Sequence, residues 1–228
     1  MKLVFDAGPI ISLTTNNLLW ILRDLKKLFD GDFCITKGVR YELVEKPLLT
    51  KKFKFEAFQV EKLIEERVLN VETPDVLFSQ NLANIANSCF FAQGHPLKIV
   101  QNGEMETLAF ALRTNKIAVV DERITPMLVE DPERLVKILE NRFHFRIFAD
   151  KKVLQQLRGL LSSLKIIRSV ELVAVAFEKG ILDGYIVGLP HAKEELLDSL
   201  LWGVKLQGCS VSEEEIKNIE SRVLSQHK

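Results

Sequence analysis

Cysteine and histidine are both scarce in this chain of 228 residues. There are three cysteines, Cys34, Cys89 and Cys209, and four scattered histidines. The cysteines do not have the paired spacing of a zinc site, and an odd number is a poor basis for a disulfide framework. These absences argue against a zinc protein and fit an intracellular, reducing compartment.

Long apolar runs and a net charge are also absent. No run approaches the roughly 20 residues of a membrane span, and Asp6 and Pro9 interrupt the apolar start in a way that a signal peptide does not show. Lys+Arg and Asp+Glu number 31 each, which argues against a protein that coats polyanions but allows a local basic groove. With 47% hydrophobic residues, the chain can form a sizeable core. We expect a soluble, cytoplasmic protein that does not bind membranes.

Short apolar segments alternate with longer amphipathic ones as far as residue 149. We expect strands at 2–5, 32–36, 67–72, 116–120 and 145–149. We expect helices at 17–29, 37–46, 51–66, 75–92, 103–115 and 123–142. This alternation predicts βαβ units, and therefore an α/β fold with a mainly parallel central sheet flanked by helices.

The chain becomes helical after residue 149. The pattern predicts helices over 151–165, 169–180, 191–208 and 212–224. Gly180 and Gly208 end two of them, in a position typical of helix C-termini. Residues 183–190 are expected to form a hinge or an extended loop.

Two aspartates stand at the ends of expected strands. Asp6 follows "KLVF" and Asp121 follows "IAVV". In open parallel sheets, ligands bind beyond the carboxyl ends of the strands, so both carboxylates could face one crevice. Each aspartate could instead cap the helix that follows it, which is a common role for Asp.

The segment "NGEMETLAFALRTN" adds two glutamates. Its apolar stripe as a helix is Met105, Leu108, Ala109 and Leu112. Glu104 lies beside that stripe at the N-terminal end, whereas Glu106 points farther round. Both could simply complement the helix dipole, an explanation that suits Glu106 better than Glu104.

A fourth acid is expected in "KGVRYELVEKP". Val39 and Leu43 give this helix a buried side, and Glu42 is the favoured candidate. Glu45, one turn farther on, is the competing position.

These motifs together resemble the PIN-domain ribonucleases, particularly the prokaryotic group related to toxin nucleases of toxin–antitoxin systems. The resemblance lies in four segments in the same order: "FDAGPIISL", "VRYEL", "GEMETLAFA" and "IAVVDER". The C-terminal segments "SVELVAVAFEKGIL" and "LLDSLLWGVKLQGCSVSEEEI" resemble the last helices of the same group. The resemblance implies a three-layer PIN-like fold and RNA phosphodiester hydrolysis. It also implies catalytic roles for Asp6, Glu42, Glu104 and Asp121.

Carboxylates gathered in one crevice need a cation or protons. Two like charges 4 Å apart repel by about 4 kcal/mol at an effective dielectric constant of 20. Oxygen-only sites suit Mg²⁺ or Mn²⁺, and Asp6, Glu104 and Asp121 are the expected ligands. Ser12 could orient a carboxylate or a phosphate, or it could simply be a buried hydroxyl bonded to the backbone. Glu106 could support the site.

RNA binding would require basic and aromatic groups. Lys37, Arg40 and Arg123 lie near the acids in sequence. In "TKKFKFEAF", Lys51, Lys52 and Lys54 alternate with phenylalanines, a combination that suits phosphates and unstacked bases. The competing interpretation, and the ordinary case for phenylalanine, is that the rings are buried and only the lysines face water.

We expect residues 1–228 to form a single PIN-like domain. Relative to the family, the chain is longer near 47–102 and 150–167, and its C-terminal helices, 168–226, are expected to pack on or extend the core. A protein antitoxin and self-association are possible partnerships of such a chain. The main alternative is a weakly active or inactive RNA-binding or assembly module on the same fold. A phosphatase with an aspartate nucleophile is a weaker alternative, because "DAGPI" lacks a second Asp two positions on.

Overall fold

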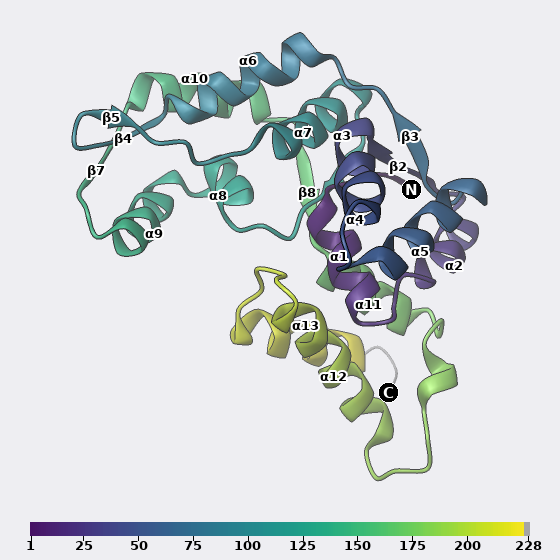
Figure 1. Ribbon diagram of the computed structural model, residues 1–228. Helices are drawn as coiled ribbons and strands as arrows, with labels where there is room; N and C mark the ends of the chain where they lie inside the picture. Colours follow the sequence, from purple (N-terminus) through teal and green to yellow (C-terminus); the bar gives the residue numbers. More distant parts are fainter. Residues whose placement is uncertain (226–228) are drawn as a thin grey trace.

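A five-stranded parallel sheet lies at the centre of the molecule (Figure 1). The computed structural model describes residues 1–225, apart from the side chains of Asn102, Val129 and Glu130. In the spatial order β3-β2-β1-β6-β8, the strands are Asn70–Glu72, Asp32–Thr36, Lys2–Phe5, Ile117–Val119 and Lys165–Ile167. All neighbouring pairs in this sheet are parallel, so the predicted α/β class is confirmed.

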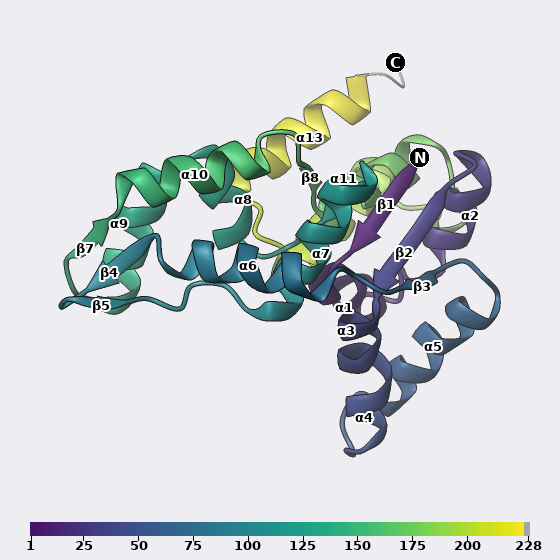
Figure 2. The same ribbon diagram turned by 90° about the horizontal axis from the view of Figure 1, so that it is seen from above.

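The sheet separates two hydrophobic cores, because successive side chains of a strand point to opposite faces. Leu3 and Phe5 on β1 belong to one core, and Val4 belongs to the other. The helices of the first core are α1 (Ala7–Thr15), α2 (Ile21–Leu28), α5 (Lys54–Glu65), α11 (Ser169–Glu178), α12 (Ala192–Leu206) and α13 (Glu213–Ser225). Those of the second are α6 (Val76–Asn87), α7 (Asn102–Thr114), α8 (Ile124–Glu130), α9 (Pro132–Phe143) and α10 (Lys151–Leu161). The three layers are seen from above in Figure 2.

A continuous helical segment follows β2. It consists of α3 (Lys37–Arg40), a π-helical turn η1 (Tyr41–Glu45) and α4 (Lys46–Leu48). The Thr36 hydroxyl caps its start by accepting a hydrogen bond from the Val39 N–H. This segment covers the expected helix at 37–46 and carries Glu42.

Residues from the two expected insertions meet in a separate lobe. A small antiparallel sheet of order β5-β4-β7 joins His95–Pro96, Phe90–Ala92 and Ile147–Ala149. Helices α6 and α10 pack together beside it, and the lobe extends to the left of the central sheet in Figure 1. The strand expected at 145–149 therefore exists, but it pairs in this second sheet and not in the central one.

Two expected helices are shorter than predicted. The helix expected at 123–142 is two helices, because proline disfavours a helical residue before it and Asp131, before Pro132, instead caps α9. The helix expected at 75–92 ends at Asn87 and is followed by β4.

Helix α1 and strand β8 were not among the expected elements. Pro9 lies in the first turn of α1, where its missing N–H would have no intrahelical partner in any case. The fifth central strand, β8, overlaps the helix expected at 151–165 only at Lys165. Because β8 has three residues, it is too short to show a period in sequence.

The C-terminal helices α11–α13 pack on the first core through residues such as Val170, Leu197 and Val223. A short 3-10 turn, η2 (Asp183–Tyr185), begins the expected loop at 183–190. Residue 226, the last of the expected C-terminal segment, lies outside the described residues. Within residues 1–225, none of the helices has both the length and the apolar character needed to cross a membrane.

Candidate active site

Strands β1 and β6 are parallel neighbours, with Phe5 aligned to Val119. The N–H of Asp6 donates to the Val119 carbonyl at 3.0 Å, and Asp121 follows two residues later. The prediction that Asp6 and Asp121 stand at the carboxyl ends of adjacent strands is therefore confirmed. Gly8 lies between them: a Cβ added there would be 3.6 Å from Asp121 Cβ and 3.8 Å from Asp6 Oδ2.

Asp6 is buried at the start of α1, with 8% of its surface exposed. Burial raises its pKa to about 6, and the charges of Glu42 and Asp121 add to this effect. The backbone N–H groups of Ala7 and Gly8 act in the opposite direction. This carboxyl group is therefore held where its ionised form is disfavoured.

Glu104 lies in the first turn of α7, about a hundred residues after Asp6 in the sequence. Its side chain accepts a hydrogen bond of 2.9 Å from the Gln101 N–H, which fixes its direction. Burial, together with the charges of Glu122, Asp6 and Glu42, raises its pKa to about 7. Glu104 and Asp6 therefore belong to one cluster of carboxylates.

Glu122 is a member of this cluster that the sequence interpretation missed. Among the charges acting on Glu104, that of Glu122 is the strongest. Its carboxylate also accepts a hydrogen bond of 2.9 Å from the Thr125 N–H at the start of α8. The sequence did contain a signal for Glu122, since it is a second acid directly after Asp121. Consecutive residues at the end of a strand point in different directions, so one of the two acids could face the cluster while the other is engaged elsewhere.

Asp121 is buried, but its carboxylate is already engaged. Oδ1 accepts a hydrogen bond from the Ser169 N–H and Oδ2 accepts one from the Ser169 hydroxyl, both at 2.7 Å. The Asp121 carbonyl also accepts a bond of 2.9 Å from the Ser210 N–H. Asp121 therefore joins the end of β6 to the start of α11 and to the segment after α12.

Glu42 and Glu45 occupy different surroundings on η1. Glu42 lines a cavity of ≈ 400 Å³ together with Lys46 and Phe53. Glu45 is paired with Arg40, whose guanidinium also bonds both oxygens of Glu61 at 3.0 Å. A π-helical turn shifts the phase of a helix and often occurs at functional sites, which is consistent with the divergence of these two acids.

Glu106 is the second glutamate of α7. A Cβ added to Gly38 would come within 2.5 Å of Glu106 Oε2, so Glu106 packs against the start of α3. Burial raises the pKa of Glu106. The expected helix phase agrees with this placement, since Met105 and Leu108 are fully buried and Glu104 is the glutamate among the other acids.

The remaining expected contacts are spread around the cluster. Ser12 is buried in α1, and its carbonyl accepts hydrogen bonds from Thr15 and Asn16. Lys37 is exposed at the start of α3, and Arg40 is held by the two glutamates described above. Arg123 is exposed and lines a separate cavity of ≈ 800 Å³ with the C-terminal helices.

The phenylalanines of "TKKFKFEAF" are exposed, which contradicts the interpretation that this segment buries them. Phe53, Phe55 and Phe58 have 44%, 71% and 65% of their surface exposed. The side chains that α5 buries are Ala57, Val60 and Leu63. The amphipathic pattern of the helix therefore satisfies the core without its aromatic residues.

The cluster suits a divalent cation in the kind of donor it offers. Asp6, Glu42, Glu104 and Glu122 supply only oxygen donors, and their mutual repulsion would be relieved by Mg²⁺ or Mn²⁺. Across the described part of the chain, no group of three or more His, Cys, Asp or Glu residues is arranged so that it could hold a metal ion.

The parallel sheet and the carboxylates at its strand ends define an α/β protein with a cluster of acids at one edge of the sheet. A family model described as a PIN domain matches residues 2–126, just over half of the chain, and the chain belongs to the PIN-domain family. The match includes all the acids of the cluster but ends before β8 and Ser169. No curated protein and no solved structure matched the chain.

Proposed function

We propose that this protein is a divalent-metal-dependent endoribonuclease that hydrolyses RNA phosphodiester bonds at the crevice between β1 and α7. PIN domains are generally nucleases, so the family supports this class of reaction. The observation that carries the proposal is the meeting of Asp6 and Glu104, whose pKa values burial raises to about 6 and about 7 among other carboxylates. Such a cluster is unfavourable unless it binds a cation or protons.

Each acid has a distinct role in this proposal. Asp6, Glu104 and Glu122 would hold the ion, and Glu42 would face the substrate. Bound Mg²⁺ or Mn²⁺ would polarise a phosphodiester oxygen and lower the pKa of a bound water. Asp121, which we expected from the resemblance to be a ligand, keeps two lone-pair directions beyond those that Ser169 uses. We propose that Asp121 is a positioning residue, which joins the end of β6 to the start of α11.

A second candidate function is an RNA-binding or assembly module with little or no catalysis. Two observations favour it: Ser169 engages both oxygens of Asp121, and no three carboxylates are arranged to hold a metal ion within residues 1–225 as described. A toxin-type role, a protein antitoxin and self-association are further predictions of the resemblance.

The decisive experiment compares Glu104→Gln with Glu106→Gln. Both changes remove one charge from the same helix with little change of shape. We expect Glu104→Gln to reduce Mg²⁺- or Mn²⁺-dependent cleavage by at least about a hundredfold, the scale of losing one electrostatic group in an active site. Glu106→Gln should have a much smaller effect, because that side chain lies against Gly38.

The assay uses equal amounts of folded protein, one single-stranded RNA and an EDTA control for contaminating nuclease. A dead Glu106→Gln beside an active Glu104→Gln would move the ligand assignment by two residues. Equal inactivity of both variants and the wild type on varied RNAs would favour the binding module.

A further inference from the structure

The segment from α4 into α5 carries aromatic and basic side chains on one exposed surface. From Lys46 to Phe55 the sequence is "KPLLTKKFKF", with four lysines and no acid. These lysines, Lys46, Lys51, Lys52 and Lys54, are exposed, and none of them is in a salt bridge within the described part of the chain.

Two cavities adjoin this surface. One, of ≈ 400 Å³, is lined by Glu42, Lys46, Lys52 and Phe53. The other, of ≈ 600 Å³, is lined by Trp20, Arg23, Phe55, Phe58 and Lys62. Thr14 lines both, so the two cavities are neighbours. The first contains Glu42, and the second lies along α5.

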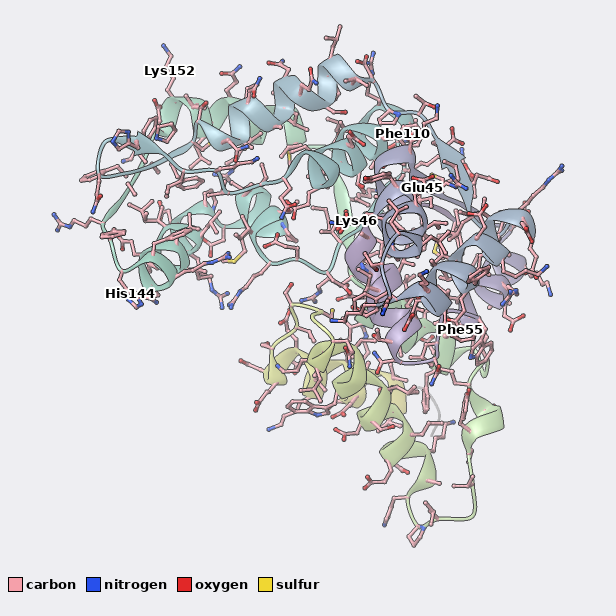
Figure 3. The ribbon with its side chains drawn as sticks, viewed as in Figure 1. Glu45, Lys46, Phe55, Phe110, His144 and Lys152 are labelled. Carbon is pink, nitrogen blue, oxygen red and sulfur yellow. The ribbon has the colours of Figure 1, made fainter. Side chains whose placement is uncertain are left out.

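The aromatic rings of this segment are exposed to solvent. Phe53 has φ 63°, a left-handed backbone conformation that is unusual for a bulky residue, and it stands at the start of α5. The Lys52 ammonium lies 4.5 Å from the centre of its ring. Phe55 and Phe58 are more exposed still, and Figure 3 places Phe55 and Lys46 on the same side of the molecule.

This composition selects one kind of occupant. Exposed rings can stack on bases, and lysines can neutralise phosphates. A duplex hides the faces of its bases, whereas an unpaired strand offers them. A protein–protein interface is a poorer fit, because lysine is depleted from the cores of such interfaces and four lysines cluster here.

We propose that residues 46–58, named here the α5 track, bind unpaired RNA. Phe53, Phe55 and Phe58 stack against bases, while the lysines of residues 46–54 contact the backbone. The proposal rests on the proposed function in one respect only, that the track delivers the strand past Glu42 to the acidic cluster.

Binding can be measured separately from cleavage by fluorescence anisotropy in EDTA. The probes are a fluorescein-labelled oligouridine and an RNA duplex of the same length. The first variant is Phe55→Ala with Phe58→Ala, and the second is Lys51→Gln, Lys52→Gln and Lys54→Gln. All five side chains are exposed, and circular dichroism with thermal melting confirms that each variant folds.

The lobe that contains the β5-β4-β7 sheet supplies control side chains of the same kinds. Phe145 and Phe148 are 50% and 63% exposed, and Lys151 and Lys152 are exposed beside them. His144 and Lys152 mark this lobe in Figure 3, far from Phe55. The control variants are Phe145→Ala with Phe148→Ala, and Lys151→Gln with Lys152→Gln.

We expect oligouridine to bind the wild type more tightly than the duplex does. Loss of the two track phenylalanines should weaken oligouridine binding by at least about tenfold, given the typical contribution of base stacking. The lysine variant should reduce the slope of log Kd against log salt by about 2, at about 0.7 per phosphate contact on a single strand. The control variants should bind as the wild type does.

Several results would overturn the proposal. One is wild-type binding by both track variants while the wild type cleaves RNA, which would leave the proposed function standing without the track. Another is equal binding of duplex and oligouridine. A third is a wild-type dimer by light scattering that the phenylalanine variant converts to monomer with RNA binding unchanged, which would make this surface an interface between copies. By contrast, track-dependent binding by a wild type that cleaves no RNA would support the track and refute the proposed function.

Discussion

Asp6 and Asp121 follow neighbouring strands of one sheet, and both are buried. Asp6 faces other carboxylates, and its pKa is raised to about 6. Asp121 accepts two hydrogen bonds of 2.7 Å from Ser169. The same sequence pattern, an apolar strand ending in aspartate, therefore occurs in two environments. The ionised form is disfavoured at Asp6, whereas the carboxylate of Asp121 is hydrogen-bonded.

The difference separates two uses of a buried acid. A carboxylate with partners contributes to stability, and leaving it unpaired would be costly. A carboxylate whose hydrogen bonds do not offset its burial and the neighbouring negative charges destabilises the fold, and it is retained where a ligand can compensate. Substitution with asparagine should therefore change stability in opposite directions at the two positions.

The largest effect should come from Asp6→Asn. We expect RNA cleavage to fall by at least about a hundredfold, while the metal-free protein becomes more stable at pH 7. A pKa raised from 3.8 to about 6 corresponds to at most about 3 kcal/mol. Urea denaturation in EDTA measures this, and Mg²⁺ should raise the melting temperature of the wild type but not of the variant. A destabilised Asp6→Asn protein would remove the contrast with Asp121.

A smaller effect of opposite sign should follow from breaking the pair formed by Asp121 and Ser169. Ser169→Ala removes one buried hydrogen bond to a charged group and leaves the backbone N–H in place. We expect a loss of about 1.5–3 kcal/mol in the free energy of unfolding, and a similar loss for Asp121→Asn. Ser162→Ala is the control, because the Ser162 hydroxyl is exposed and bonds only locally, to the Gly159 carbonyl. Unchanged stability in Ser169→Ala would contradict a stabilising role for the bond between the Ser169 hydroxyl and Asp121.

A pH dependence of stability should also arise from the acidic cluster. The pKa values of Asp6 and Glu104 are raised in the folded state, so the folded protein binds more protons than the unfolded chain between about pH 4 and 7. Metal-free stability should therefore fall as the pH rises through this range. The double variant Asp6→Asn, Glu104→Gln should fall less steeply in parallel melts. Parallel curves for the two proteins would mean that these groups titrate normally.

The strands that precede Asp6 and Asp121 could be predicted because each is a short apolar run that ends at an aspartate. Periodicity also placed Glu104 correctly relative to the buried stripe through Met105 and Leu108. These are local properties, set by the spacing of residues within one element.

What the sequence did not reveal depends on distant partners. Ser169 lies 48 positions from Asp121, so nothing near Asp121 distinguishes it from Asp6. Strand β8 is identified by its pairing with β6 and not by its own three residues. The exposure of Phe55 could not be predicted from the usual burial of phenylalanine. Val60 and Leu63 are the residues of the same helix that pack in the core.

The hydrogen bonds between Asp121 and Ser169 also determine when the site can form during translation. All the acids of the crevice lie within residues 6–122, and at about 5–20 residues per second they leave the ribosome several seconds before Ser169. Until then β6 is an unpaired sheet edge, and Asp121 has neither of its partners. The site therefore becomes complete only after Ser169 has emerged, and a nascent chain that carries every acid of the cluster does not yet hold Asp121 in place.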